Sequence, residues 1–240
     1  MSQTQSAPVV VAGKLSRRDM LLFILGGFFI TNAVVAEIIG GKLFTAELGI
    51  GPIQLPPAVL SIGLLPWPLV FLTTDLINEY FGKPAVRRLT FLTVAMISYV
   101  FLALYIAKSV KGHPEIGVPD EAFAKVAGQS MWIIAGSLVA FLVSQFVDVF
   151  VFWFFRNRTQ GRRLWLRATG STVVSQLVDT FIVTFIGLYL PGVMTLDVAL
   201  RSASTAYLYK VLIAVALTPL IYLFHGVIDA YLTRDEPRPA

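Results

Sequence analysis

The sequence predicts an all-α, polytopic membrane protein with six transmembrane helices, a proline-broken second helix and both termini in the cytoplasm. Composition is the first observation behind this prediction: 56% of the 240 residues are hydrophobic and only 14% are charged, whereas a soluble domain carries about 25% charged residues. The second is the length of the apolar runs, because a helix needs about 20 apolar residues to cross a bilayer. Six segments qualify: 20–40, 58–81, 89–107, 131–155, 169–190 and 207–228.

The third observation is the distribution of the basic residues. Thirteen of the 19 Lys and Arg residues lie before the first segment, in alternate loops or after the last segment. The positive-inside rule places these loops, and therefore both termini, in the cytoplasm. Orientation in an inner (plasma) membrane thus accounts for the net charge of +5, and we expect no nucleic-acid partner.

The remaining regions indicate a single integral membrane domain over residues 1–240, with disordered tails at 1–13 and 233–240. The loop at 40–57 is rich in Gly and Pro, and we expect it at the outer surface as a re-entrant or capping segment. The polar loop at 108–130 contains a short helix near 121–127. Because the chain has no cysteine and only two well-separated histidines, we expect neither a metal site nor a cofactor.

The second segment contains two prolines, Pro66 and Pro68. A proline removes a backbone donor and clashes with the preceding turn, and a membrane tolerates such a break where protein or a water-lined cavity satisfies the backbone. Broken helices of this kind line many transporter sites. A kink that serves packing alone explains the two prolines equally well.

The same segment carries polar residues to membrane depth. Its apolar part, 58–72, is too short to span, so the helix must include Asp75, Asn78 and Glu79. Their spacing of three and four positions places them on one helical face. Two carboxylates and an amide on one face cannot point toward lipid.

A repeated motif places further acids in the membrane. SQFVDVF (144–150) and SQLVDTF (175–181) are identical at five of seven positions. Within each copy, the Ser, Gln and Asp share one helical face. The distance from neighbouring arginines puts both aspartates between the midplane and the cytoplasmic side, so we expect the two faces to meet across an antiparallel hairpin. The residues concerned are Ser144, Gln145 and Asp148 in the first copy, and Ser175, Gln176 and Asp179 in the second.

Ionisable groups at the bilayer centre cost about 2.5–3.5 kcal/mol each and are functional candidates. Packing is one explanation: Lys210 pairs with an aspartate, and Gln145 and Gln176 bond across the hairpin. For the whole set, which also includes Glu37, a polar cavity is the better explanation, since one lysine cannot neutralise five carboxylates. The candidate site residues are Asn32, Asp75, Asn78, Glu79, Gln145, Asp148, Gln176, Asp179 and Lys210.

The chemistry of these residues indicates a particular kind of ligand. Carboxylates accept N–H donors or bind a cation, and amides read both donors and acceptors. Planar heterocycles stack on aromatic rings, so the cavity suits a small, flat solute that is rich in donors or cationic. The stacking candidates are Trp67, Phe71, Tyr80, Phe146, Phe150, Phe181 and Tyr209.

The stretch FLTTDLINEYFGKPAVRR (71–88) resembles the signature of the queuosine-precursor transporters, also called vitamin uptake transporters. The family pattern is D-x-x-N-E-x-x-G-K-x-x-A-R, and here the alanine falls one position away from it. The S-Q-x-x-D segments and the arginine-rich loop between them are also similar, so the resemblance covers residues 20–228. The matching residues are Asp75, Asn78, Glu79, Gly82, Lys83 and Arg87.

The resemblance implies import of 7-cyano-7-deazaguanine and 7-aminomethyl-7-deazaguanine, precursors of queuosine in tRNA. One carboxylate can accept both N1–H and the exocyclic amine, and our hypothesis assigns Glu79 or Asp148 to this Watson–Crick edge. Gln145 and Gln176 then read the remaining ring atoms, and a glutamine amide or Lys210 meets O6. A second carboxylate can hold the ammonium of the aminomethyl form.

The sequence is also compatible with two other functions. The first is a substrate-binding membrane subunit for another flat, vitamin-like solute, working with a separate ATPase, because this chain has no P-loop. The second is an intramembrane aspartyl protease using Asp148 and Asp179, but such enzymes share a G-x-G-D motif and Ser-Gln-Leu-Val precedes Asp179. We therefore expect no enzymatic activity. Small residues in the first and fourth helices permit close helix contacts, and a homodimer is the expected assembly.

Overall fold

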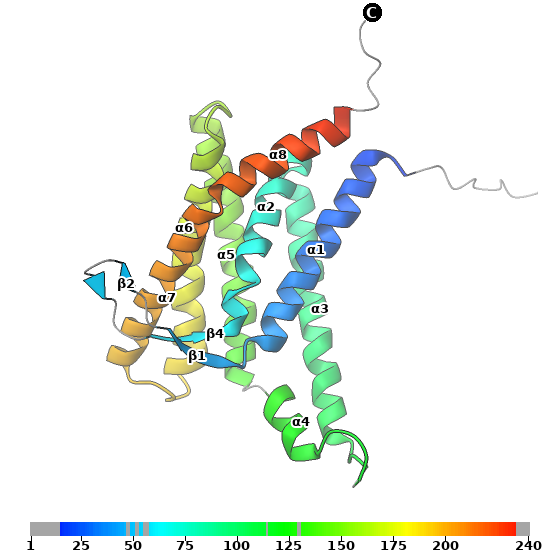
Figure 1. The fold of residues 1–240 in the computed structure, drawn as a ribbon, viewed down its shortest axis with the longest axis vertical. Helices are drawn as coiled ribbons and strands as arrows, with labels where there is room; N and C mark the ends of the chain where they lie inside the picture. Colours follow the sequence, from blue (N-terminus) through cyan, green and yellow to red (C-terminus); the bar gives the residue numbers. More distant parts are fainter. Residues whose placement is uncertain are drawn as a thin grey trace, which may run out of the picture.

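The chain folds into a bundle of helices that run between two ends (Figure 1). The computed structural model describes residues 15–46, 49–50, 53–54, 58–113, 115–128 and 131–233; the tails expected to be disordered lie outside this part, apart from Thr233. Five stretches are helical, long and apolar enough to cross a membrane. They contain α1 (Arg17–Ile39), α3 (Lys83–Ser109), α5 (Met131–Arg158), α6 (Leu164–Thr184) with its π-helical continuation η2 (Phe185–Tyr189), and α7 (Leu196–Ala216).

Shorter elements complete the described part of the fold. We call the end at which α1 begins the terminal end and the opposite end, where β1 and β4 lie, the strand end (Figure 1). The shorter helices are η1 (Ile62–Leu64), α2 (Trp67–Phe81), α4 (Asp120–Ala127) and α8 (Thr218–Leu232). The strands are β1 (Leu43–Ala46), β2 (Gly49–Ile50), β3 (Ile53–Gln54) and β4 (Ala58–Ser61).

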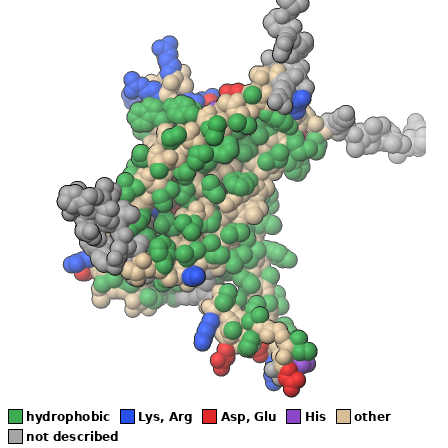
Figure 2. Space-filling view, in the orientation of Figure 1, with side chains coloured by type: hydrophobic (Ala, Val, Ile, Leu, Met, Phe, Trp, Pro, Cys, Tyr) green, Lys and Arg blue, Asp and Glu red, His purple; other side chains and the backbone are tan. Residues whose placement is uncertain are grey.

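The flanks of the bundle are apolar, as a lipid environment requires. On the face shown in Figure 2, most of the coloured side chains between the two ends are hydrophobic. Helix α3, for example, exposes Tyr99, Leu102 and Tyr105. In water these side chains would form a large unfavourable patch, whereas lipid tails solvate them. The structure therefore agrees with the prediction of a multi-pass helical membrane protein.

Basic residues gather at the terminal end, as their alternation along the sequence predicts. Arg17 donates a hydrogen bond to the carbonyl oxygen of Tyr231 on α8, at 3.0 Å, and Arg18 donates one to that of Tyr80 on α2, at 2.7 Å. These contacts hold the start of α1 beside the ends of α2 and α8. Both described chain ends thus lie at one end of the bundle (Figure 1).

The second apolar segment differs from the prediction. Residues 58–64 form the strand β4 and the short 3₁₀ helix η1 in place of an α-helix. Strand β4 pairs with β1 in antiparallel register from Ala46–Ala58 to Leu43–Ser61. Pro66 directly precedes α2 and Pro68 lies in its first turn, where a missing N–H costs no helical hydrogen bond. The prolines therefore start α2 and do not interrupt a helix that is already running.

The sixth segment was also placed wrongly. Residues 207–228 cross the boundary between α7 and α8, which lies at Leu217 with Pro219 in the first turn of α8. Helix α7 starts eleven positions earlier than predicted, because residues 196–206 continue the helix despite Arg201 and several small polar side chains. The other four long segments and the short helix near 121–127 are confirmed, although α3 and α6 begin at Lys83 and Leu164, five or six positions before the predicted starts.

Helix α2 is enclosed by its neighbours, and its polar residues are therefore buried inside the bundle. Every residue from Val70 to Asn78 is buried. One apolar core packs α2 against α1, α3 and α5; its buried members include Val70, Phe29, Ile97 and Phe141. At its end Gly82 adopts φ +77°, a conformation that glycine allows without strain, and the chain turns directly into α3.

Small residues are used for packing within the chain. A Cβ atom at Gly136 on α5 would lie 2.9 Å from the backbone N of Gly187 in η2, so these two elements touch through glycine. A Cβ at Gly26 on α1 would lie 3.1 Å from the side chain of Leu89. These close contacts within one chain account for the small residues in the first and fourth segments, so a second copy of the chain is not needed to explain them. The homodimer stays a prediction.

Candidate functional site

The two copies of the repeated motif face each other between α5 and α6. Ser144 Oγ donates a hydrogen bond to Asp179 Oδ1 at 3.4 Å, and Ser175 Oγ donates one to Asp148 Oδ1 at 3.0 Å. All four side chains are buried. Each serine binds the aspartate of the other copy, which confirms the prediction that the two polar faces meet across the hairpin.

Lys210 on α7 pairs with one of these aspartates. Its Nζ lies 2.7 Å from Asp179 Oδ2, so this carboxylate has Lys210 on one oxygen and Ser144 on the other. A buried carboxylate is costly unless a cation or hydrogen-bond donors compensate it. The sequence left open whether Lys210 pairs with an aspartate, and the structure shows that it does.

The two glutamines of the repeat have different surroundings. Gln145 Nε2 donates to Thr74 Oγ1 on α2 at 3.3 Å and so ties α5 to α2. Gln176 is buried, and its Nε2 has no hydrogen-bond partner within the described ranges. The explanation in which the two glutamines bond to each other is therefore not what the structure shows.

The three polar residues of α2 also have different surroundings. Glu79 Oε1 forms an ion pair with Arg167 Nη2 at 2.9 Å, and Arg156 Nη2 lies 3.7 Å away. Asn78 is fully buried, and neither its Oδ1 nor its Nδ2 meets a partner among the residues the structure describes. Asp75 is also buried with its Oδ1 unpartnered in the same set, and it faces a cavity.

Arg167 is a residue of the site that the sequence pattern does not indicate, because its position suggests a basic residue of a cytoplasmic loop. It lies inside α6, is 5% exposed, and donates a hydrogen bond to the carbonyl oxygen of Gly161 as well as pairing with Glu79. The available signal was its spacing. Arg167 and Asp179 lie twelve positions apart, with Ser171 and Ser175 at the intervening steps of four, so all four follow one stripe of the helix.

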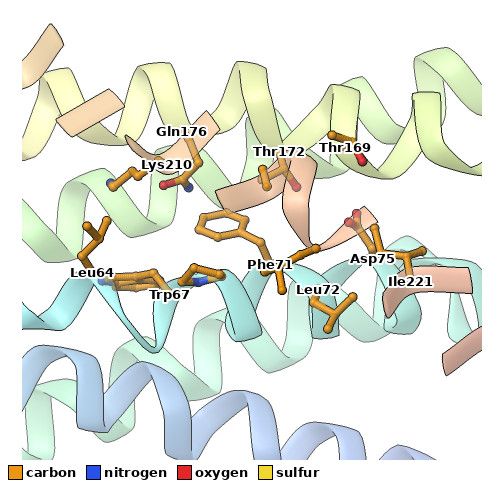
Figure 3. Close-up of a pocket in the computed structure, with 13 residues that line it drawn as sticks. Leu64, Trp67, Phe71, Leu72, Asp75, Thr169, Thr172, Gln176, Lys210 and Ile221 are labelled. Atoms are coloured by element: carbon orange, nitrogen blue, oxygen red, sulfur yellow. The ribbon is translucent and has the colours of Figure 1, made fainter. Parts of the chain in front are cut away.

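One cavity lies among α2, α6, α7 and α8, with about 440 Å³ of empty space that includes open solvent; we call it the deep cavity. Figure 3 shows Asp75 and Phe71 on α2, with Gln176 on α6 and Lys210 on α7 around the same space. The rings of Trp67 and Phe71 lie 6.1 Å apart, centroid to centroid. A carboxylate, an amide, an amine and two aromatic rings thus surround one small space.

A second cavity lies toward the strand end, with about 1220 Å³ of empty space that includes open solvent; we call it the strand-side cavity. Its wall includes β4, η1 and parts of α1, α5, α6 and α7. Two of its acids are Glu37 and Asp179. The two cavities are adjacent, because Leu64, Trp67 and Lys210 line both.

Some predicted residues lie apart from these cavities. Asn32 Nδ2 donates to the carbonyl oxygen of Phe28 on its own helix, and Asn32 lines neither cavity. Among the stacking candidates, Phe146 and Phe150 are exposed on the flank of the bundle. Tyr80 Oη donates to Asp229 Oδ1 at 2.7 Å near the terminal end. Of the predicted rings, Trp67 and Phe71 line the deep cavity.

Comparison with known proteins gives a consistent picture. Residues 61–224 match a family described as "Putative vitamin uptake transporter". The chain is 31% identical over 166 residues to a "Probable queuosine precursor transporter" of Bacillus subtilis (strain 168), covering 68% of this chain and 70% of the relative. It is also 31% identical over 172 residues to the "Queuosine precursor transporter" of Escherichia coli (strain K12), covering 68% and 73%. No solved structure matches the chain.

Proposed function

Since the chain belongs to the vitamin uptake transporter family, whose proteins are transporters and not enzymes, we propose that it imports queuosine precursors. The substrates we infer are 7-cyano-7-deazaguanine and 7-aminomethyl-7-deazaguanine, and the destination is the cytoplasm. The observation that carries the proposal is the deep cavity, which Asp75, Gln176 and Lys210 line together with two aromatic rings.

The deep cavity complements a deazaguanine group by group. Asp75 can accept N1–H and the exocyclic amine together, because a carboxylate has two acceptor oxygens and one of them is unpartnered in the described part. Gln176 Nε2 and Lys210 Nζ are donors suited to O6. The flat ring system stacks against Trp67 or Phe71, as bases stack on aromatic side chains in other proteins.

This assignment replaces Glu79 or Asp148 with Asp75 at the Watson–Crick edge. Glu79 is engaged by Arg167 and Arg156, and neither Glu79 nor Asp148 lines the deep cavity. Asp148 accepts the hydrogen bond of Ser175, so its role in the proposal is to hold α5 against α6. Gln145 has the same kind of role toward α2.

We propose that the protein lies in the inner membrane with its terminal end in the cytoplasm. The basic residues at that end support it. Helix α2 has 15 residues and a length of about 22 Å, less than the hydrocarbon thickness of about 30 Å. We therefore infer that η1 and β4 complete its crossing, which gives six crossings, and that the strand-side cavity faces outward.

Uptake of radiolabelled 7-cyano-7-deazaguanine tests the proposal in cells that cannot synthesise it. Cells expressing the chain should accumulate the label, and Asp75→Asn should lower the initial rate about tenfold or more, because an isosteric amide cannot accept both N–H groups. Asp197→Asn is the matched control, since Asp197 is exposed on α7 and pairs with Arg201. An absence of uptake by correctly inserted protein would contradict the proposal.

Uptake of the same label into liposomes distinguishes the alternative in which a separate ATPase is required. Purified chain in liposomes should catalyse uptake down a substrate gradient without ATP. If liposomes stay inactive while cells accumulate the label, a partner subunit is required.

A further inference from the structure

We propose that Asp75 on α2 and Asp148 on α5 form a proton-binding site, and that the protein carries one proton into the cytoplasm with each substrate molecule. This inference rests on the proposed function and adds a source of energy for uptake. It follows from the burial, the hydrogen bonds and the charged neighbours of the two carboxylates.

Both carboxylates are buried and incompletely bonded. Asp75 is 3% exposed and Asp148 is 0% exposed. Ser175 Oγ donates a hydrogen bond to Asp148 Oδ1 at 3.0 Å, but Asp148 Oδ2 and Asp75 Oδ1 have no partner among the residues that the structure describes. An ionised carboxylate is costly in such surroundings unless donors or a cation compensate it, and a bound proton removes its charge.

The two carboxylates also act on each other. Gln145 Nε2 donates to Thr74 Oγ1 at 3.3 Å, so α5 and α2 are joined next to Asp75 and one turn away from Asp148. Ser171 on α6 interacts with both carboxylates, and Asp148 is the charged group that acts most strongly on Asp75. Two carboxylates that share a buried site repel each other and hold one proton between them.

The buried cations near this pair are engaged by other acids. Arg167 and Glu79 both act on Asp75, but they bind each other at 2.9 Å. Lys210 lines the deep cavity with Asp75, but its Nζ lies 2.7 Å from Asp179 Oδ2. The two carboxylates of the pair therefore have no ion-pair partner within the described ranges. Titratable groups on α1, α3 and α8 have contacts of their own, namely Glu37 with Ser137, Lys83 with the Trp153 ring and His225 with Tyr80.

Substrate and proton should favour each other's binding at this site. Figure 3 shows Asp75 at the wall of the deep cavity, opposite Thr169 and Thr172 of α6. A ring bound there displaces water from the two carboxylates, which raises the free energy of a second negative charge. The ring donates its N–H groups to Asp75, so the proton is held on Asp148, whose Oδ2 is the unpartnered acceptor in the described part.

The pair lies between the two sides of the membrane. Trp67 and Lys210 line both cavities, so the deep cavity adjoins the strand-side cavity through which the proton arrives from the outer water. Glu79 lies one turn beyond Asp75 toward the terminal end, and its neighbour Arg156 is 30% exposed there. The proton leaves Asp148 for the cytoplasm after the substrate has left and water has returned. A lower external pH therefore favours uptake.

Purified protein in liposomes tests the inference with the labelled cyano precursor, which has no ammonium group. The liposome interior is about 1 pH unit more alkaline than the outside, and the membrane potential is clamped at zero. Wild-type protein should accumulate the label about tenfold, since one proton per substrate converts 1 pH unit into a tenfold concentration ratio.

Three variants locate the proton. Asp148→Asn can still accept the hydrogen bond of Ser175 but cannot bind the proton, so the label should enter only until its concentrations are equal. Ser175→Ala breaks the same contact and keeps the carboxylate, so accumulation driven by the pH gradient should persist. Asp197→Asn, which is exposed on α7 and pairs with Arg201, should behave like the wild type.

The outcomes separate the inference from the function on which it rests. If wild-type protein does not exchange unlabelled for labelled precursor at equal pH, the proposed function fails. If it exchanges the label but a pH gradient drives no accumulation, the proton site is overturned and the proposed function stands. Full accumulation by Asp148→Asn also overturns the site. Should Asp148→Asn fail to fold, calorimetry of the wild type in two buffers of different ionisation enthalpy decides: proton uptake on substrate binding supports the site, and none overturns it.

Discussion

Ser175 Oγ donates a hydrogen bond to Asp148 Oδ1 at 3.0 Å, and the matching serine of the other repeat, Ser144, donates to Asp179. The exchange ties α5 to α6, but the two aspartates are not equivalent. Asp179 also has Lys210, whereas Asp148 Oδ2 has no partner within the described residues. The two aspartates therefore depend to different degrees on their serine partners, although the two repeats are nearly identical in sequence.

The two serine substitutions should have unequal effects. Ser175→Ala removes the hydroxyl from Asp148 and should lower the free energy of unfolding by about 1–3 kcal/mol. Ser144→Ala should cost less, because Lys210 still binds Asp179. Thermal unfolding in detergent measures both variants, and an equal or reversed order would contradict this interpretation.

The Lys210–Asp179 pair should show strong coupling. Lys210→Met leaves a buried carboxylate without its cation, which costs about 3–5 kcal/mol when one partner of a buried pair is removed. The double variant Lys210→Met/Asp179→Asn should recover much of that stability but not uptake, since Lys210 also lines the deep cavity. A double-mutant cycle on unfolding measures the coupling, and additive effects would count against the pair.

Arg167 should contribute more to stability than Arg156, although both face Glu79. The Arg167 contact is 2.9 Å long and its side chain is 6% exposed, against 3.7 Å and 30% for Arg156. We expect Arg167→Met to lower the unfolding temperature clearly, and Arg156→Met to change it little because a partly exposed pair contributes about 0–1 kcal/mol. Similar shifts for the two variants would show that burial does not decide the difference.

Aromatic substitutions should separate the deep cavity from the lipid-facing surface. Trp67→Leu removes a ring from the cavity wall and should raise the substrate concentration for half-maximal uptake about tenfold, as stacking of one base contributes about 1–3 kcal/mol. Phe150→Leu is the control, since that ring is 70% exposed on α5. Equal effects of both substitutions would argue against stacking on Trp67.

Periodicity predicted much of the site. The spacing of three and four positions correctly placed the Ser and Asp of each repeat on facing surfaces. The spacing alone could not show which acid faces a cavity. Asp75 and Glu79 share a helical face, and only the residues of other helices that pack against them distinguish the two. Arg167 and Arg156 reach Glu79 from segments far away in the sequence, and such contacts depend on packing.

The errors in the fold have physical causes. Residues 58–61 are apolar enough for a helix, but pairing with residues 43–46 makes them a strand, and the partner is distant in sequence. The prolines were read as breaks inside a helix, whereas the structure uses one before α2 and one in its first turn. Both interpretations are compatible with the local sequence, and tertiary contacts select between them.

Binding of 7-cyano-7-deazaguanine to the purified protein, measured by calorimetry for wild type and Asp75→Asn, tests the central claim most directly. We predict saturable binding by the wild type and an affinity at least about tenfold lower for Asp75→Asn, because a buried charged hydrogen bond is lost. Glu79→Gln should alter stability more than affinity, since Glu79 lies outside the deep cavity. An affinity unchanged by Asp75→Asn, in protein that remains folded, would contradict the account.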